Sequence, residues 1–235
     1  MFKVLYMQWL LASASRNEVR IKILAVVTVT LFTLAAVHNN DIFWGDSTIL
    51  SYLRADNETW RQFFDRFDLT VLVSVSSVLV VSAVLWVFRK RLEAVVNLFI
   101  LPAMVFTVAL PKIFVKRPRP EGELEGLTNS FPSGTATVSI LLLGFLIYLV
   151  GEFVEPRKLR IGLQLLLGFA IVLLGVFRML AGEHWPSDIA GGYMAGALAL
   201  FAIIRLHRSL RQRSIPLGVA TTKKHRSIGK TSLYI

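Results

Sequence analysis

The chain has 235 residues, 54% of them hydrophobic, and its mean hydropathy of +0.61 is higher than that of ordinary soluble domains. It contains no cysteine, which excludes disulfide bonds, thiolate metal sites and a cysteine nucleophile. The formal net charge of +11 would suit a partner that is nucleic acid or anionic lipid, and the distribution of the charges decides between them.

The first residues, MFKVLYMQWLLASAS, combine a lysine, an apolar run and small residues, as a secretory signal peptide does. The apolar run is short, however, and a longer apolar segment follows almost at once. We therefore predict that residues 1–20 form an amphipathic helix in the membrane interface, with a cleaved signal peptide as the alternative.

Six later segments approach the roughly 20 apolar residues that a helix needs to cross a bilayer. The apolar residues show no alternating pattern of the kind that membrane strands have. We therefore predict an all-α polytopic membrane protein with its membrane domain over residues 21–204. The six predicted transmembrane helices are Ile21–Val37, Leu69–Phe88, Leu92–Leu110, Gly134–Val150, Ile161–Leu180 and Ile189–Ile204.

The segment between the first two predicted spans, residues 39–68, mixes aromatic residues with charges. Trp and Tyr are enriched where a membrane meets water. We predict one or two interfacial helices here, beside the entry for a lipid.

The basic residues indicate the orientation in the membrane. Most of the 26 Lys and Arg fall in residues 1–22, 89–91, 157–160 and 205–235, whereas most of the 15 acidic residues fall in the other loops. Cytoplasmic loops carry an excess of Lys and Arg. We therefore place both termini in the cytoplasm, with residues 205–235 as a basic tail, and the loops after the first, third and fifth spans outside. Topology then accounts for the charge, so we expect no nucleic-acid partner.

Three outer segments carry residues suited to chemistry. The first, KIFVKRPRP over Lys112–Pro120, is dense in cations. Cations on the outer side run against the positive-inside trend, which favours a specific anion as their partner over general contact with headgroups.

The second segment, FPSGTATVSI over residues 131–140, opens the fourth predicted span. Ser133 is a favourable N-cap residue, and Gly134 lets a ligand approach the backbone closely. The free N–H groups and the dipole at such a helix start attract anions. A plain helix cap without a ligand is the alternative.

The third segment, FRMLAGEHWPSDIAGG over residues 177–192, joins the last two spans. The spacing of His184 and Asp188 allows a carboxylate–imidazole hydrogen bond, which would fix the ring tautomer and stabilise the cation formed when the other nitrogen attacks. Arg178 offers a planar fork that suits phosphate oxygens.

Together these segments resemble the motifs of the type 2 phosphatidic acid phosphatase superfamily, which includes lipid phosphatases, undecaprenyl-diphosphate phosphatases, lipid A phosphatases and, more distantly, vanadium haloperoxidases. The first family motif, K-x6-R-P, is matched by Lys112, Arg119 and Pro120. The second, P-S-G-H, is matched by residues 132–134, but Thr135 stands in the place of the histidine.

The third family motif, S-R-x5-H-x3-D, is matched by Arg178, His184 and Asp188, with Phe177 in the place of the serine. The resemblance covers residues 41–204. It implies that His184 attacks phosphorus to form a phosphohistidine, which water then opens, and that Asp188 orients the ring. It also implies a set of groups that bind the phosphoryl oxygens, namely Lys112, Arg119, Ser133, Gly134 and Arg178.

Such an arrangement neutralises the charge of phosphoryl transfer without a metal. Three outer residues with side chains able to bind metal are too loosely spaced to predict a metal site; they are His38, Asp41 and Asp46. We therefore expect neither a metal nor a cofactor.

The family's second-motif histidine is the general acid that protonates the leaving oxygen. A threonine hydroxyl at position 135 is far too weak an acid for this, and the loss of a general acid costs about 10²- to 10⁴-fold in rate. The cost is smallest for a diphosphate, because phosphate is a less basic leaving group than an alkoxide. Thr135 has three interpretations: a substitution made to trap or disable an enzyme, a natural change in an enzyme with easy leaving groups, or a natural change in a protein that no longer hydrolyses. His38 is a further candidate as substitute proton donor.

We therefore predict a metal-independent phosphatase of a membrane lipid phosphate or diphosphate, such as undecaprenyl diphosphate, phosphatidylglycerol phosphate or lipid A 1-phosphate. We place it in the cell inner membrane with the active site facing the periplasm, although a luminal site in the endoplasmic reticulum would show the same charge bias. The alternatives are a lipid phosphotransferase with the same phosphohistidine, and a protein that binds or transports a lipid phosphate without turnover.

Overall fold

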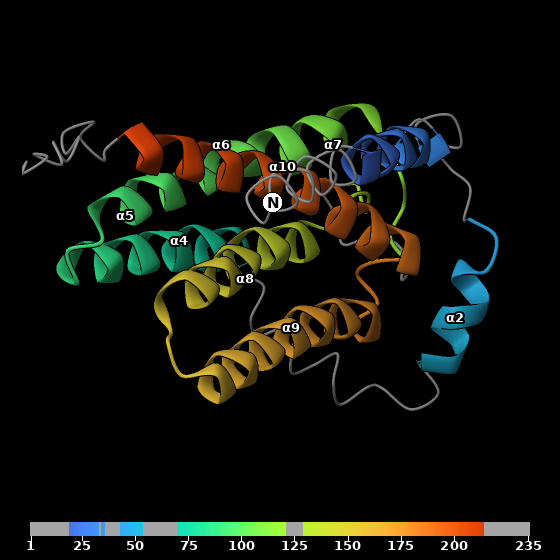
Figure 1. Ribbon diagram of the computed structural model, residues 1–235. Helices are drawn as coiled ribbons and strands as arrows, with labels where there is room; N and C mark the ends of the chain where they lie inside the picture. The colour runs from blue at the N-terminus through green and yellow to red at the C-terminus, as the bar shows by residue number, and fades with distance from the viewer. Residues whose placement is uncertain (1–18, 33, 36–42, 54–69, 121–128, 214–235) are drawn as a thin grey trace, which may run out of the picture.

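The regular elements of the described chain are all helices (Figure 1). The computed structural model describes residues 19–32, 34–35, 43–53, 70–120 and 129–213. An all-α fold is therefore confirmed for this part of the chain. The predicted interfacial helix over residues 1–20 and the tail beyond residue 213 lie almost wholly outside the described residues, as does His38.

A first helix covers residues 19–32. The short helix α2 (Asp46–Leu53) follows within the predicted interfacial segment, and its flanking Trp44 and its Tyr52 are exposed. The remaining elements are α4 (Thr70–Val87), α5 (Arg91–Leu98), α6 (Ile100–Met104), the π-helical turn η1 (Val105–Ala109), α7 (Leu110–Phe114), α8 (Gly134–Phe153), α9 (Arg157–Leu180) and α10 (Pro186–Arg213).

Four of the described helical segments are long and apolar enough to cross a membrane, and they contain the third to sixth predicted spans. They are Arg91–Phe114, which joins α5 to α7, and α8, α9 and α10. The second predicted span corresponds to a shorter apolar helix, Leu72–Val87, and the first to the helix over residues 19–32. Six membrane crossings therefore stay a prediction.

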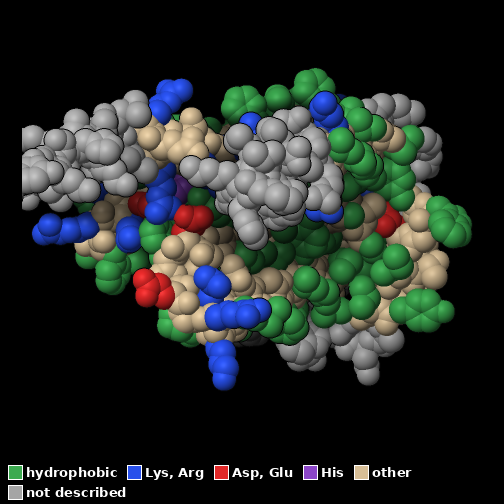
Figure 2. Space-filling model, in the orientation of Figure 1, with side chains coloured by type: hydrophobic (Ala, Val, Ile, Leu, Met, Phe, Trp, Pro, Cys, Tyr) green, Lys and Arg blue, Asp and Glu red, His purple; other side chains and the backbone are tan. Residues whose placement is uncertain are grey.

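The outside of the bundle is apolar. On α9, Leu165, Leu166, Phe169 and Val172 are each more than half exposed. Apolar side chains cover much of the described surface, whereas Lys and Arg gather towards the end of the molecule that carries the α4–α5 and α8–α9 turns (Figures 1 and 2). Exposed apolar surface on this scale suits a membrane rather than water.

Helix α8 lies inside the bundle and contacts α4, α6, α9 and α10. Its Leu141 and Phe145 are fully buried in one core cluster with Val78 of α4 and Ile203 of α10. The start of α8 meets the start of α10 at the end of the bundle opposite the basic turns (Figure 1). The Ser133 amide donates a hydrogen bond to the Asp188 carbonyl there, at 3.1 Å.

Gly192 of α10 permits this close approach, because a Cβ at position 192 would lie 2.7 Å from the Ser133 carbonyl oxygen. We expect Gly192→Ala to lower stability by about 1–3 kcal/mol, since the obstacle is backbone that cannot turn aside. Gly168→Ala on α9 is the matched control, because no atom lies within 4 Å of its Cβ position. Thermal melting in detergent should show a fall for Gly192→Ala and none for Gly168→Ala; equal melting temperatures would contradict this packing.

A second buried histidine, His207, lies near the other end of α10, far from the contact between Ser133 and Asp188. The ring of His207 is fully buried, and its Nδ1 is 2.9 Å from the Tyr148 hydroxyl. Its Nε2 is 3.5 Å from a carboxylate oxygen of Glu93. This polar cluster ties α5, α8 and α10 together.

Candidate phosphate site

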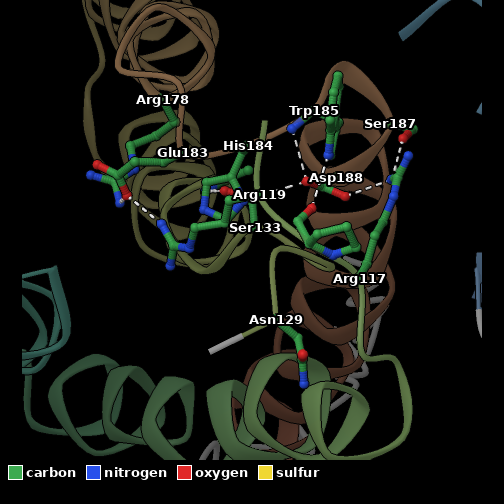
Figure 3. A network of polar contacts seen from close by, with 12 residues as sticks. Arg117, Arg119, Asn129, Ser133, Arg178, Glu183, His184, Trp185, Ser187 and Asp188 are labelled. Atoms are coloured by element: carbon green, nitrogen blue, oxygen red, sulfur yellow. Dashed lines mark hydrogen bonds and ion pairs between the residues drawn. The ribbon is translucent and has the colours of Figure 1, made fainter. Parts of the chain in front are cut away.

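The three segments that the sequence predicts to lie outside meet at one end of the bundle (Figure 3). The Trp185 indole of the α9–α10 loop donates to the Pro118 carbonyl at 3.0 Å, which joins the third segment to the first. The hydrogen bond from Ser133 to Asp188 joins the third segment to the second. All eight predicted site residues belong to these segments, and the structure brings the segments together.

His184 is buried, with 2% of its surface exposed, in the short loop before α10. Its Nδ1 lies 3.6 Å from Oδ2 of Asp188, slightly beyond hydrogen-bonding distance. Burial lowers the pKa of His184 below its usual 6.5, and the Asp188 carboxylate acts in the opposite direction. The imidazole is therefore neutral near pH 7 and has a nitrogen lone pair available for attack.

Asp188 is fully buried at the start of α10 and has two strong partners of its own. Its Oδ2 accepts from the Trp185 amide at 2.8 Å, and its Oδ1 accepts from the Arg117 guanidinium at 2.7 Å. These bonds fix the carboxylate beside His184, whatever else binds in the site.

Arg117 is a site residue that motif matching missed. It is 1% exposed and also donates to Asp46 of α2 at 2.6 Å and to the Ser187 hydroxyl at 2.6 Å. Asp46 in turn accepts from the Ser187 amide at 2.9 Å. The sequence holds one signal for Arg117, since Arg-Pro occurs twice in succession at residues 117–120, but none for Asp46.

Arg119 and Arg178, two predicted phosphate ligands, lie on either side of the Glu183 carboxylate (Figure 3). Arg119 Nη1 is 3.0 Å from Glu183 Oε2, and Arg178 Nη2 donates to the same oxygen. Glu183 is 6% exposed. These contacts of Glu183 were not predicted, because the family motif leaves the position before the histidine unspecified.

Lys112, in the last turn of α7, is the third of the predicted phosphate-binding cations. It is close enough to Arg119, Arg178, Glu183 and Asp188 to interact electrostatically with all four. Its Nζ donates to the Asn129 carbonyl at 2.7 Å, and the Asn129 side chain donates back to the Lys112 carbonyl at 2.6 Å. The Ser130 amide donates to the Arg117 carbonyl at 2.8 Å beside this pair.

Ser133 is the N-cap of α8, as its sequence context predicted. Its hydroxyl oxygen accepts from the Ala136 amide at 3.4 Å, and its backbone is extended. Gly134 is the first helical residue. An anion bound at this helix start would gain from the helix dipole.

Thr135 borders a cavity of about 350 Å³ between α4, α8 and α9. Its hydroxyl is buried and has no hydrogen-bond partner among the described residues. Phe177 and Arg178 line the same cavity, so the cavity reaches one cation of the site. Its other walls are mainly apolar, with Ser74, Ser77 and Ser139 as polar exceptions.

No group of three or more His, Asp or Glu side chains within the described ranges is arranged to hold a metal ion. Asp46, whose spacing in the sequence predicted no metal site, is paired with Arg117. Independence from metal stays a prediction.

Comparison with known proteins gives two matches. The family model of the PAP2 superfamily matches residues 92–212, just over half of the chain. The fold is similar to the crystal structure of a transmembrane PAP2 type phosphatidylglycerolphosphate phosphatase from Bacillus subtilis, with a TM-score of 0.60 and 20% sequence identity over 81% of this chain and 96% of that one. A search of curated protein sequences gives no match.

Proposed function

This chain belongs to the PAP2 superfamily, and we propose on that basis that it removes a phosphoryl group from a membrane lipid phosphate or diphosphate, with His184 as the nucleophile. One observation supports this most directly. The buried His184 imidazole, neutral near pH 7, lies in one cluster with the cations of Lys112, Arg119 and Arg178. A neutral nucleophile among fixed cations suits attack on a dianion.

The proposed reaction has two steps. The free ring nitrogen of His184 forms a bond to phosphorus while the bond to the lipid oxygen breaks, and water then cleaves the nitrogen–phosphorus bond to release inorganic phosphate. Asp188 stabilises the positive ring of the intermediate. The guanidinium groups of Arg119 and Arg178 bind phosphoryl oxygens in fork geometry. The Ser133 hydroxyl and the Gly134 amide, at the start of α8, also bind phosphoryl oxygens.

The cavity beside Thr135 supports a lipid substrate. Its lining is mainly apolar and includes Arg178, so an acyl or prenyl chain in the cavity could carry its phosphate to Arg178. The orientation that we propose puts the site on the outer side of an inner membrane, because the basic turns lie at the opposite end of the bundle (Figure 1).

We expect Thr135→His to raise turnover of a lipid monophosphate by at least about tenfold, since a histidine at this position would protonate the leaving alkoxide. The gain should be smaller with a lipid diphosphate, whose leaving phosphate needs a proton less. The measurement is phosphate released from both lipids in detergent micelles by purified wild-type and variant proteins. Release from neither lipid by either protein, with binding retained, would favour a binding protein; equal rates for the two proteins would contradict the assigned role of position 135.

The pH dependence of kcat/KM should report the burial of His184. Only the neutral ring is a nucleophile, and burial lowers its pKa, so activity should be retained down to pH 6.5 and be lost only as the pH falls further through the lowered pKa. A pH series with a lipid monophosphate measures this acid limb. An acid limb centred above pH 6.5 would contradict a buried, neutral nucleophile.

A further inference from the structure

The helix α2, which carries none of the family motifs, supplies a buried carboxylate to the candidate site. It lies at the end of the bundle where α9 ends and α10 begins, and it contacts both (Figure 1). Its first residue, Asp46, is 3% exposed. Oδ1 of Asp46 accepts from the Ser187 amide at 2.9 Å, and Oδ2 accepts from the Ser187 hydroxyl and from the Arg117 guanidinium, each at 2.6 Å.

The guanidinium of Arg117 connects Asp46 to Asp188. Its Nη2 donates to Asp46, while its Nη1 donates to Asp188 Oδ1 at 2.7 Å and to the Ser187 hydroxyl at 2.6 Å. The Phe43 ring, three residues before Asp46, lies 4.8 Å from Arg117 Cζ. Its Nε is buried and has no hydrogen-bond partner in the described part of the chain. The orientation of the guanidinium therefore depends on both carboxylates.

Asp188 carries this restraint to the predicted nucleophile. Its Oδ2 lies 3.6 Å from Nδ1 of His184, and Nδ1 is buried with no hydrogen-bond partner among the described residues. The Asp188 carboxylate is therefore the group that favours a proton on Nδ1, which leaves Nε2 as the nitrogen free to attack. If Arg117 moved, Oδ1 of Asp188 would lose its charged donor, and only the Trp185 amide would still hold the carboxylate.

We infer that Asp46 is a positioning residue for the proposed reaction. It holds Arg117, Arg117 holds Asp188, and Asp188 fixes the tautomer and orientation of His184. This inference rests on the proposed function of His184 as the nucleophile. The hydrogen bonds of Asp46 go to Arg117 and Ser187, neither of which is among the predicted phosphate ligands. Asp46 therefore acts on the rate of attack and not on the binding of the phosphoryl group.

Loss of the Asp46 carboxylate would release the Arg117 side chain but not the backbone around it. The Ser130 amide donates to the Arg117 carbonyl at 2.8 Å, and the Trp185 indole donates to the Pro118 carbonyl at 3.0 Å. These two bonds hold the chain just before the phosphate ligand Arg119. In Asp46→Asn the side chain keeps its size and can still accept from the Ser187 amide, but its NH₂ group then faces the guanidinium and cannot accept from it.

The first test is the kinetics of Asp46→Asn with a lipid monophosphate in detergent micelles. We expect kcat to fall by about 10- to 100-fold, as it does when a catalytic group is displaced, without a rise in KM. Calorimetric titration with sulfate counts the intact sites, so the rate is expressed per folded molecule. Glu152→Gln is the matched control, because Glu152 also pairs with an arginine, Arg211, but at the exposed opposite end of the bundle. Its kcat should equal that of the wild type.

Nitrogen NMR of protein labelled at histidine gives a second test that needs no turnover. The chain has four histidines, so the signals missing from the His184→Ala spectrum belong to His184. At neutral pH the His184 proton should lie on Nδ1 in the wild type and in Glu152→Gln. In Asp46→Asn it should be shared between the two ring nitrogens.

Three results would overturn the inference: an unchanged kcat for Asp46→Asn, a rise in KM without a fall in kcat, or an unchanged His184 tautomer. Failure of the wild type to release phosphate from any lipid would instead count against the proposed function. The tautomer of His184 in Asp46→Asn would still decide whether Asp46 positions the ring.

Discussion

Replacing His184 with alanine is expected to abolish phosphate release, with a fall in kcat of about 10⁴-fold or more. The size of the effect follows from covalent catalysis, because removal of the nucleophile leaves only binding and electrostatic stabilisation by the remaining groups. When turnover is stopped with base, the wild-type protein should carry acid-labile phosphate, as a phosphohistidine does. The His184→Ala protein should carry none. Survival of turnover in this variant would remove the phosphohistidine mechanism.

Two controls separate loss of chemistry from loss of fold. Sulfate should still bind to the His184→Ala protein, because the cations of the site remain. His207 offers a matched comparison, since it is also a fully buried histidine but lies at the other end of α10. The rate of phosphate release per folded molecule of His207→Ala should equal that of the wild type. Loss of catalysis per folded molecule in both variants would mean that the effect is not specific to the site.

The second large effect is expected for Arg117→Met. The side chain is 1% exposed and neutralises the carboxylates of Asp46 and Asp188, so its removal leaves two buried negative charges without the cation that pairs with them. Breaking a buried ion pair from one side costs about 3–5 kcal/mol. We expect a large fall in melting temperature in detergent and loss of phosphate release, because Asp188 would no longer be fixed beside the nucleophile.

The double variant Arg117→Met with Asp46→Asn should recover part of the lost stability, since it removes one of the two unpaired charges. Arg157→Met is the control for loss of an arginine, because that residue is exposed at the start of α9 and surface changes of this kind alter stability by less than about 0.5 kcal/mol. A melting temperature for Arg117→Met equal to that of the control would show that the pairing contributes nothing.

Hydropathy predicted the helices well, and motif spacing singled out three segments that the structure brings together. Four predicted spans lie inside helices long enough to cross a membrane, because a run of about 20 apolar residues has few other stable environments. The predicted positions of the helix ends were less accurate. The helix of the third span runs to Phe114 rather than Leu110, through the π-helical turn at Val105–Ala109, and apolar composition carries no information on such a local change of hydrogen bonding.

Motif spacing did not reveal how charges pair within the site. It placed Arg119 and Arg178 near each other but gave no sign that Glu183 lies between them. Asp46 and Arg117 are 71 positions apart in the chain, and their contact depends on where α2 docks. Spacing along a helix or loop predicts local neighbours, whereas the choice of ion-pair partner across the bundle is made by tertiary packing.

The hydrogen bonds of Asn129 and Ser130 have a consequence for how this protein can be altered. Lys112 and Asn129 bond to each other in both directions, and Ser130 bonds to Arg117, so the two ends of the connection from residue 120 to residue 129 are held together at its base. Closing a longer loop on a fixed base costs little additional entropy. We therefore expect a peptide tag inserted between residues 120 and 129 to leave the anion site assembled.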